Sequence, residues 1–132
     1  LSSAIQTSGN RNLHLVLRGG NNGPNYDAVS IHKAAESLAS EGLPKAIMID
    51  CNHANSGKDP SRQELVLRDA VHQIKNGDNS IIGIMIESNI NGGNQPISAS
   101  LQYGVSITDA CLDWKNTNRI ILNAHQSLAT FS

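Results

Sequence analysis

The chain has 132 residues, of which 39% are hydrophobic and 16% carry a charge, and its formal net charge at pH 7 is −1. This length allows one domain with a core of its own. The charge is near zero, and the lysines and arginines are scattered along the chain. We therefore expect no long-range attraction to nucleic acid or to a membrane, and neither as a partner.

The cysteines and the apolar runs indicate the compartment. Two cysteines, Cys51 and Cys111, do not make the framework of a disulfide-stabilised protein, so we expect a reducing compartment, the cytoplasm. No apolar run reaches the roughly eighteen residues of a membrane span. The chain begins at Leu1 in a polar stretch, which is typical of the middle of a longer protein.

Apolar runs and amphipathic patterns predict the secondary structure. Three short apolar runs predict buried strands: residues 14–17, 46–50 and 80–86. Three amphipathic stretches predict helices: 28–41 capped by Asp27, 60–76 opened by Asp59 and Pro60, and a last helix capped by Thr117 that runs through Leu128. Between them, 89–102 predicts a long polar loop, and 107–114 a turn or short helical piece in which Trp114 anchors the last helix to the core.

This order of elements predicts an α/β fold. Apolar strands that alternate with amphipathic helices are typical of a parallel sheet covered by helices. Polar side chains follow each strand: Arg18, then Asp50 and His53, then Glu87. Ligand sites of α/β proteins lie at the carboxyl ends of the strands. Since three strands cannot close a barrel, the chain is either an open three-stranded layer or a piece of something larger.

One imidazole and two carboxylates are the candidate metal ligands. His53, Glu87 and Asp109 each lie at or just after the end of a separate element, and this set of ligands suits Mn, Fe, Zn or Co. Taken singly, His53 is equally well explained as a loop histidine bound to backbone, and Asp109 is better explained as a helix cap. Glu87 is harder to explain away, because a carboxylate directly after a buried strand needs a partner.

Two neighbouring features have weaker support. Cys51 is a possible fourth ligand, because it would share a face with His53 if the strand ran that far, but a small buried thiol is the better interpretation. Arg18, Gly19 and Gly20 form a plausible anion site, since a guanidinium and accessible backbone N–H groups both bind oxyanions.

Several long motifs resemble one family. The segments HLVLRGG, GLPKAIMIDCNHANSGK, SIIGIMIES and YGVSITDAC occur in the order and at the spacing found in the C-terminal half of the aromatic-amino-acid-regulated, microbial type of 3-deoxy-D-arabino-heptulosonate 7-phosphate (DAHP) synthase. The resemblance extends over essentially all 132 residues. It implies that the chain supplies the last three β/α units of a TIM (β/α)8 barrel, with residues 1–12 as the trailing arm of an inserted hairpin.

The resemblance also implies a reaction, the first step of the shikimate pathway. This is the metal-dependent, aldol-like condensation of phosphoenolpyruvate with erythrose 4-phosphate, which gives DAHP and phosphate. Of the family's metal ligands, a Cys, a His, a Glu and an Asp, the last three match His53, Glu87 and Asp109. Arg18 matches an arginine that binds phosphoenolpyruvate. Arg18 and His53 are therefore the expected catalytic residues, and both, with Asp109, are expected to contact substrate.

The family pattern is incomplete in this chain. The metal-binding cysteine of the family lies near the first barrel strand, so the resemblance removes Cys51 from the ligand set. We expect the chain to be inactive by itself. A homo-oligomer (dimer or tetramer) and an aromatic amino acid as feedback inhibitor are implied for the whole enzyme. Two alternatives stay open: a non-catalytic half-barrel used for oligomerisation or regulation, and another metal-dependent aldolase or hydrolase.

Overall fold

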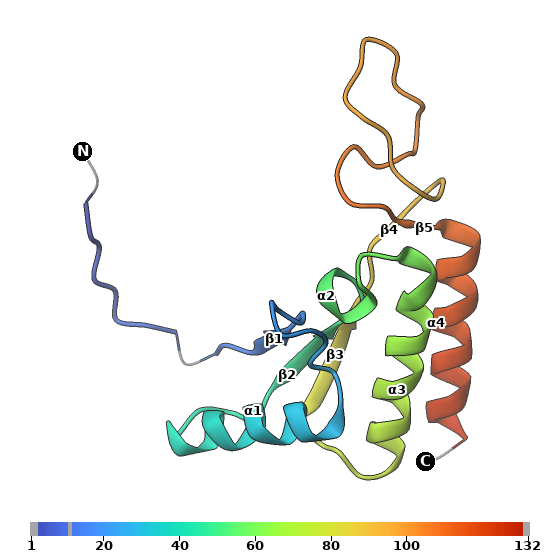
Figure 1. Ribbon diagram of the computed structural model, residues 1–132. Coiled ribbons are helices and arrows are strands. Elements are labelled where there is room, and N and C mark those ends of the chain that lie inside the picture. Colours follow the sequence, from blue (N-terminus) through green and yellow to red (C-terminus); the bar gives the residue numbers. More distant parts are fainter. Residues whose placement is uncertain (1–2, 11, 131–132) are drawn as a thin grey trace.

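A three-stranded parallel sheet lies at the centre of the computed structural model, which describes residues 3–10 and 12–130 (Figure 1). Its strands are β1 (Leu15–Leu17), β2 (Ile47–Asp50) and β3 (Ile81–Met85), in the spatial order β1-β2-β3. Both neighbouring pairs are parallel. The predicted α/β class with parallel strands is confirmed.

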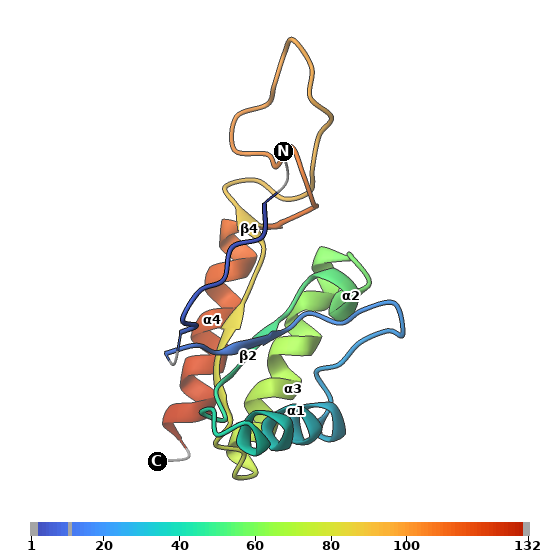
Figure 2. The same ribbon diagram turned by 90° about the vertical axis from the view of Figure 1, so that its left-hand side faces the viewer.

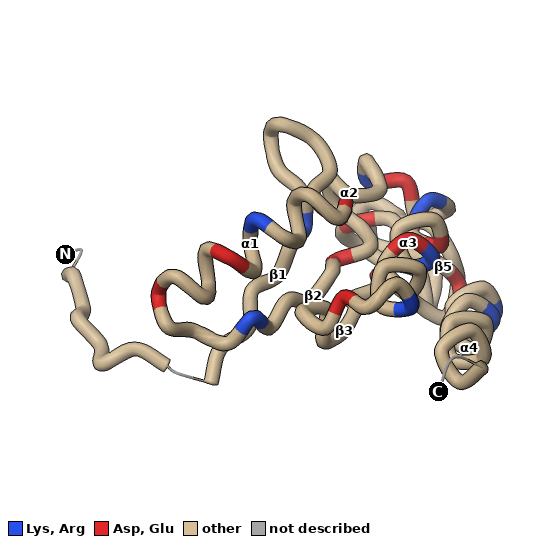
Figure 3. Tube along the Cα trace, turned by 90° about the horizontal axis from the view of Figure 1, so that it is seen from below, with Lys and Arg blue, Asp and Glu red and all other residues tan. Residues whose placement is uncertain are grey.

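Helices connect the strands of the sheet. The remaining elements, in chain order, are α1 (Ala28–Ser40), α2 (His53–Ser56), the 3-10 turn η1 (Pro60–Arg62), α3 (Gln63–Lys75), β4 (Ser88–Asn89), β5 (Leu112–Asp113) and α4 (Trp114–Ala129). Helix α1 connects β1 to β2, and the segment from α2 to α3 connects β2 to β3. Positively and negatively charged residues are interspersed over these elements (Figure 3), as the scattered charges of the sequence predict.

Local sequence explains why α1 forms where it does. The Asp27 carboxylate accepts hydrogen bonds from the backbone N–H groups of Val29 and Ser30, at 3.1 and 3.0 Å. These bonds, with that from the Ser30 hydroxyl, lower the pKa of the Asp27 carboxyl below its ordinary value, the hydroxyl having the largest effect. After the last turn, Gly42 adopts a φ of +67°, which favours glycine. The predicted N-cap is confirmed.

One face of the sheet carries the core. Ile47 and Ile49 of the central strand are fully buried. They belong to a single apolar cluster to which the three long helices also contribute, from α1 Ile31, Ala35 and Leu38, from α3 Val66, Leu67, Ala70 and Val71, and from α4 Ile120. The three strands thus use one face for packing against α1, α3 and α4.

The other face of the sheet is open, so the expectation of buried strands covered by helices is wrong for β1 and β3. Val16 is 37% exposed and Met85 42%. Side chains alternate between the two faces of a strand, and the described helices cover only one of them. An apolar run therefore predicted the strands correctly but not how much of each strand is covered.

Two predicted helix starts differ from the structure. Asp59 accepts a hydrogen bond from the Ser61 N–H at 2.9 Å, but it caps the 3-10 turn η1, and α3 begins at Gln63. The last helix begins at Trp114 with Asp113 as its N-cap, because Asp113 accepts from the Asn116 N–H at 2.7 Å. Asp113 serves as N-cap four residues before Thr117, so the helix starts earlier than predicted.

Two side chains of α4 also differ from prediction. Trp114 is 63% exposed, so it does not anchor the helix to the core. Thr117 is buried, and its hydroxyl hydrogen-bonds the Asp113 carbonyl at 2.9 Å and the Ser88 hydroxyl at 2.6 Å. The residue expected as a cap therefore ties the first turn of α4 to β4.

A second, two-stranded parallel sheet joins segments far apart in the chain. β4 and β5 pair through Ser88 with Leu112 and Asn89 with Asp113. Between them lies a long loop that projects beyond the rest of the molecule (Figures 1 and 2). Residues 107–110 form no helix, and the expected turn or helical piece ends instead in β5. The sequence does not predict this pairing, because β4 consists of two polar residues, Ser88 and Asn89, and has no apolar strand pattern.

The N-terminal segment has no helix or strand among residues 3–10 and 12, and these residues are exposed. It leads away from the sheet in Figure 1. Leu1, Ser2 and Arg11, which belong to the expected trailing arm at residues 1–12, lie outside the described residues. Within the described part of the chain, none of the helices has the length and apolarity needed to cross a membrane.

The one-sided core gives a direct test. Replacing Ile49→Ala removes a fully buried side chain from the central strand, and we expect it to lower the free energy of unfolding by about 2–5 kcal/mol. Val16→Ala is the control on the open face, where we expect a change of about 0.5 kcal/mol or less. Denaturant unfolding followed by circular dichroism measures both. Equal losses would contradict the one-sided core.

Candidate metal centre

His53 follows the central strand in an unusual backbone conformation. The chain leaves β2 at Asp50, and His53 begins the short helix α2 with a φ of +48°, which residues other than glycine rarely adopt. Two side-chain contacts accompany this turn, since the Asp50 carboxylate accepts from the Asn52 N–H at 2.8 Å and pairs with His53 Nδ1 at 2.7 Å. Strained backbone at a strand end is typical of functional sites.

The Asp50 contact decides which nitrogen of His53 is free. A carboxylate oxygen accepts hydrogen bonds, so Nδ1 carries the proton and donates a hydrogen bond to Asp50. Nε2 then presents a lone pair on the opposite side of the ring. The sequence alone leaves a backbone-bound loop histidine as an equal alternative for His53, but in the structure the ring of His53 contacts carboxylates instead.

Nε2 of His53 faces the two carboxylates expected as its partners. It lies 3.5 Å from Glu87 Oε1 and 3.8 Å from Asp109 Oδ2. One ligand atom from each of these three residues lies within 4.8 Å of the other two, and all three side chains are partly exposed. The structure thus brings together residues that are 34 and 22 positions apart in the chain (53 to 87 and 87 to 109).

This arrangement fits a divalent cation. Two carboxylates this close repel each other unless a positive charge lies between them. One imidazole nitrogen and two carboxylate oxygens are ligands that transition metals accept, and the partial exposure leaves room for further ligands. Asp109 also lies 3.8 Å from Lys58 Nζ, a mostly exposed ammonium. Asp109 is no helix cap, since α4 begins at Trp114 and is capped by Asp113.

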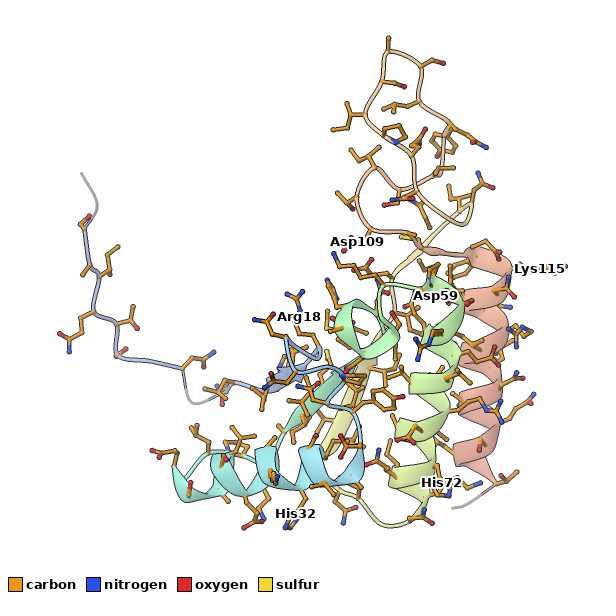
Figure 4. All side chains as sticks on the ribbon, viewed as in Figure 1. Arg18, His32, Asp59, His72, Asp109 and Lys115 are labelled. Carbon is orange, nitrogen blue, oxygen red and sulfur yellow. The ribbon has the colours of Figure 1, made fainter. Side chains whose placement is uncertain are left out.

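Arg18 leaves β1 at the same end of the sheet. Figure 4 labels Arg18 and Asp109 on the side toward which the strands' carboxyl ends point. The Arg18 side chain is exposed, and its guanidinium forms no ion pair with any residue of 3–10 or 12–130. A guanidinium without a protein partner at a strand end is available to an anionic ligand.

A buried asparagine, which the sequence analysis missed, ties the ends of β1 and β2 together. Asn55 is 1% exposed, and its Nδ2 donates to the carbonyls of Leu17 at 3.0 Å and Asp50 at 2.8 Å. Its Oδ1 accepts from the Asn25 N–H at 2.9 Å. Asn55 thereby fixes the backbone next to Arg18 and His53. An asparagine in a polar loop carries no sequence signal that distinguishes this role from an exposed one.

Cys51 is not part of the group. Its side chain is fully buried, and burial, helped by the negative charge of Asp50, raises the pKa of the Cys51 thiol to about 12. Metals bind the thiolate, which such a pKa disfavours at neutral pH. Cys51 is therefore a small buried thiol, the interpretation favoured from the sequence.

Gly19 gives a test of how closely α2 packs on the end of β1. Its φ is +74°, and a Cβ added there would lie 2.7 Å from the Ala54 Cβ. We expect Gly19→Ala to lower the free energy of unfolding by about 1–3 kcal/mol, through this strain. Gly20→Ala is the matched control, because a Cβ there meets nothing within 4 Å. Denaturant unfolding of both variants measures the difference, and equal stability would contradict the close packing.

Comparisons with known proteins match the whole site region. The model of the DAHP synthetase I family matches residues 1–122. The Tyr-sensitive phospho-2-dehydro-3-deoxyheptonate aldolase of Escherichia coli K12 is 44% identical over 127 residues, which cover 94% of this chain and 35% of that protein. The tyrosine-inhibited aldolase of Schizosaccharomyces pombe is 46% identical over 123 residues, 89% of this chain and 33% of the relative.

A solved structure agrees with these relatives. The phospho-2-dehydro-3-deoxyheptonate aldolase of Francisella tularensis SCHU S4 superposes with a TM-score of 0.88 at 39% identity, over 96% of this chain and 37% of that one. The chain thus spans about a third of the length of these three proteins. With a family model matched over residues 1–122, the chain belongs to the DAHP synthetase I family.

Proposed function

We propose that this chain is the C-terminal part of a DAHP synthase and contributes three ligands to its metal ion. The observation that carries the proposal is the convergence of His53 Nε2, Glu87 and Asp109 within 4.8 Å at the carboxyl end of a parallel sheet. Membership of the DAHP synthetase I family supplies the reaction. That reaction is the condensation of phosphoenolpyruvate with erythrose 4-phosphate to DAHP and phosphate, the first step of the shikimate pathway.

Each side chain has a defined role in this proposal. A divalent cation such as Mn, Fe, Zn or Co, when bound, supplies Lewis-acid stabilisation of the aldehyde oxygen of erythrose 4-phosphate. Glu87 and Asp109 balance its charge, and neutral His53 favours a transition metal over magnesium. Arg18 holds phosphoenolpyruvate through its phosphate or carboxylate and aims the reacting carbon at the aldehyde. His53 and Asp109 also border the substrates.

The open sheet face supports the barrel part of the proposal. Val16 and Met85 are exposed on the face that the described helices leave uncovered. In a (β/α)8 barrel this face points into the barrel and packs against the other strands. We propose that β1, β2 and β3 belong to such a barrel as part of its last three β/α units, and that residues 1–12 are the trailing arm of an inserted hairpin.

Regulation and assembly follow from the same proposal. The names of the relatives, Tyr-sensitive in Escherichia coli and phenylalanine-inhibited in Saccharomyces cerevisiae, describe inhibition by aromatic amino acids. We propose an aromatic amino acid as inhibitor of the whole enzyme, a homo-oligomeric state (dimer or tetramer), and the cytoplasm as its compartment. The free thiols of Cys51 and Cys111 agree with a reducing compartment.

Metal binding by the chain tests the ligand set. We expect Mn²⁺ to bind the unchanged chain, and His53→Ala or Glu87→Gln to weaken binding by at least about 100-fold, because each removes a ligand atom. His125→Ala and Glu41→Gln, which change exposed residues of the same types, should bind Mn²⁺ as the unchanged chain does. Isothermal titration calorimetry measures the affinities. Normal affinity in His53→Ala or Glu87→Gln would refute this ligand set.

A chimera tests the reaction. The chain replaces the aligned segment of the Escherichia coli relative, to which it is 44% identical. We expect this chimera to release phosphate from phosphoenolpyruvate when erythrose 4-phosphate and Mn²⁺ are present, and the 132-residue chain alone to release none.

Variants of the chimera separate the alternatives. Glu87→Gln in the chimera should abolish phosphate release, while Glu41→Gln should not. A folded chimera that binds Mn²⁺ but catalyses no condensation would favour another metal-dependent aldolase or hydrolase. A folded chimera that binds no Mn²⁺ would favour a non-catalytic half-barrel. Activity of the isolated chain would contradict the need for the remaining strands.

A further inference from the structure

We infer that Gln63 is a positioning residue of the metal centre, which sets the place of the Glu87 carboxylate by holding the Glu87 backbone. Gln63 is the first residue of α3 and its side chain is fully buried. Its Nε2 donates to the Glu87 carbonyl at 3.1 Å, and its Oε1 accepts from the Glu87 N–H at 2.9 Å. The side-chain amide thus pairs with both backbone groups of one residue, 24 positions away.

Glu87 needs such a partner because it lies beyond the sheet. The ladder between β2 and β3 ends at the bond from the Cys51 N–H to the Met85 carbonyl, at 2.9 Å. Two residues later, the Glu87 carbonyl also accepts from the Leu112 N–H at 3.0 Å, but the Glu87 N–H has Gln63 Oε1 as its partner. The amide of Gln63 takes the place that a neighbouring strand would have.

The same segment carries both His53 and Gln63, so the two hydrogen bonds between Gln63 and Glu87 also affect the geometry of the metal centre. His53 begins α2 and Gln63 begins α3, with η1 between them. Because Gln63 fastens Glu87 to this segment, it contributes to the 3.5 Å separation of His53 Nε2 and Glu87 Oε1. Without the two hydrogen bonds from Gln63, the backbone after β3 is held less firmly, and the Glu87 carboxylate can move away from the His53 ring.

The same helix offers a matched control. Gln73 is also buried, and its Nε2 donates to the Tyr26 carbonyl at 2.8 Å and to the Asp69 carboxylate. It lies ten residues along α3, which corresponds to about 15 Å of helix. Its hydrogen-bond partners among the described residues are Tyr26 and Asp69, not Glu87, His53 or Asp109. Gln73→Met and Gln63→Met therefore both remove buried amide hydrogen bonds, but only Gln63→Met loosens Glu87.

The inference rests on the proposed metal centre and is tested with the full 132-residue chain. We expect both Gln→Met variants to have a lower thermal midpoint. Only Gln63→Met should bind Mn²⁺ about 10- to 100-fold more weakly, the usual cost of losing a partner that orients a metal ligand. It should also change the visible absorption spectrum of bound Co²⁺, which reports the arrangement of the ligand atoms. Gln63→Asn, which is one methylene too short to reach both Glu87 groups, should behave in the same way.

The outcomes separate this inference from the proposed function. Unchanged Mn²⁺ affinity and an unchanged Co²⁺ spectrum in folded Gln63→Met or Gln63→Asn would overturn the role of Gln63 and leave the metal centre intact. Equal loss of affinity in the Gln73→Met control would also overturn it, because the effect would then be one of general stability. No Mn²⁺ binding by the unchanged chain would refute the proposed metal centre itself, and the role of Gln63 with it.

Discussion

Buried side-chain amides that complete the backbone hydrogen bonds beyond the sheet are the interaction on which the site depends. Parallel strands end at one edge, and the peptide groups after each strand lose their ladder partners while still shielded from water. Asn55 supplies partners to the Leu17 and Asp50 carbonyls, and Gln63 supplies them to Glu87. Each amide thus connects two elements and fixes the backbone of the residues that follow the strands.

The charge of Asp50 also positions the site, by orienting the His53 ring. The Asp50 carboxylate accepts a hydrogen bond from the Nδ1–H of His53 and turns Nε2 toward Glu87 and Asp109. Asp50 is 3% exposed, so its negative charge is costly unless an N–H group balances it, and it has two such donors, the His53 ring and the Asn52 backbone. A short, strained turn at His53 is therefore stabilised by the carboxylate that also orients its ring.

The sheet shows how a site can be well ordered on a one-sided scaffold. Its packed face, with Ile47 and Ile49 fully buried, is the face to which α1, α3 and α4 contribute. The opposite face exposes Val16 and Met85. The metal ligands depend on the packed face and on the strand ends, so the trio is assembled within this chain, while an apolar surface remains for other strands of the proposed barrel.

The sequence by itself determined the parallel α/β fold, the Asp27 cap of α1 and the order in which polar residues follow the strands, because apolar periodicity and capping act over a few residues. Only the tertiary structure decided that β1 and β3 are covered on one side, that β4 pairs with β5, and that Gln63 reaches Glu87. These features depend on contacts between segments more than twenty residues apart, which no local pattern encodes. The convergence of His53, Glu87 and Asp109 is of both kinds. The places of His53 and Glu87 just after strands were visible in the chain, but Asp109 lies in the loop before β5, and the distances among the three required the fold.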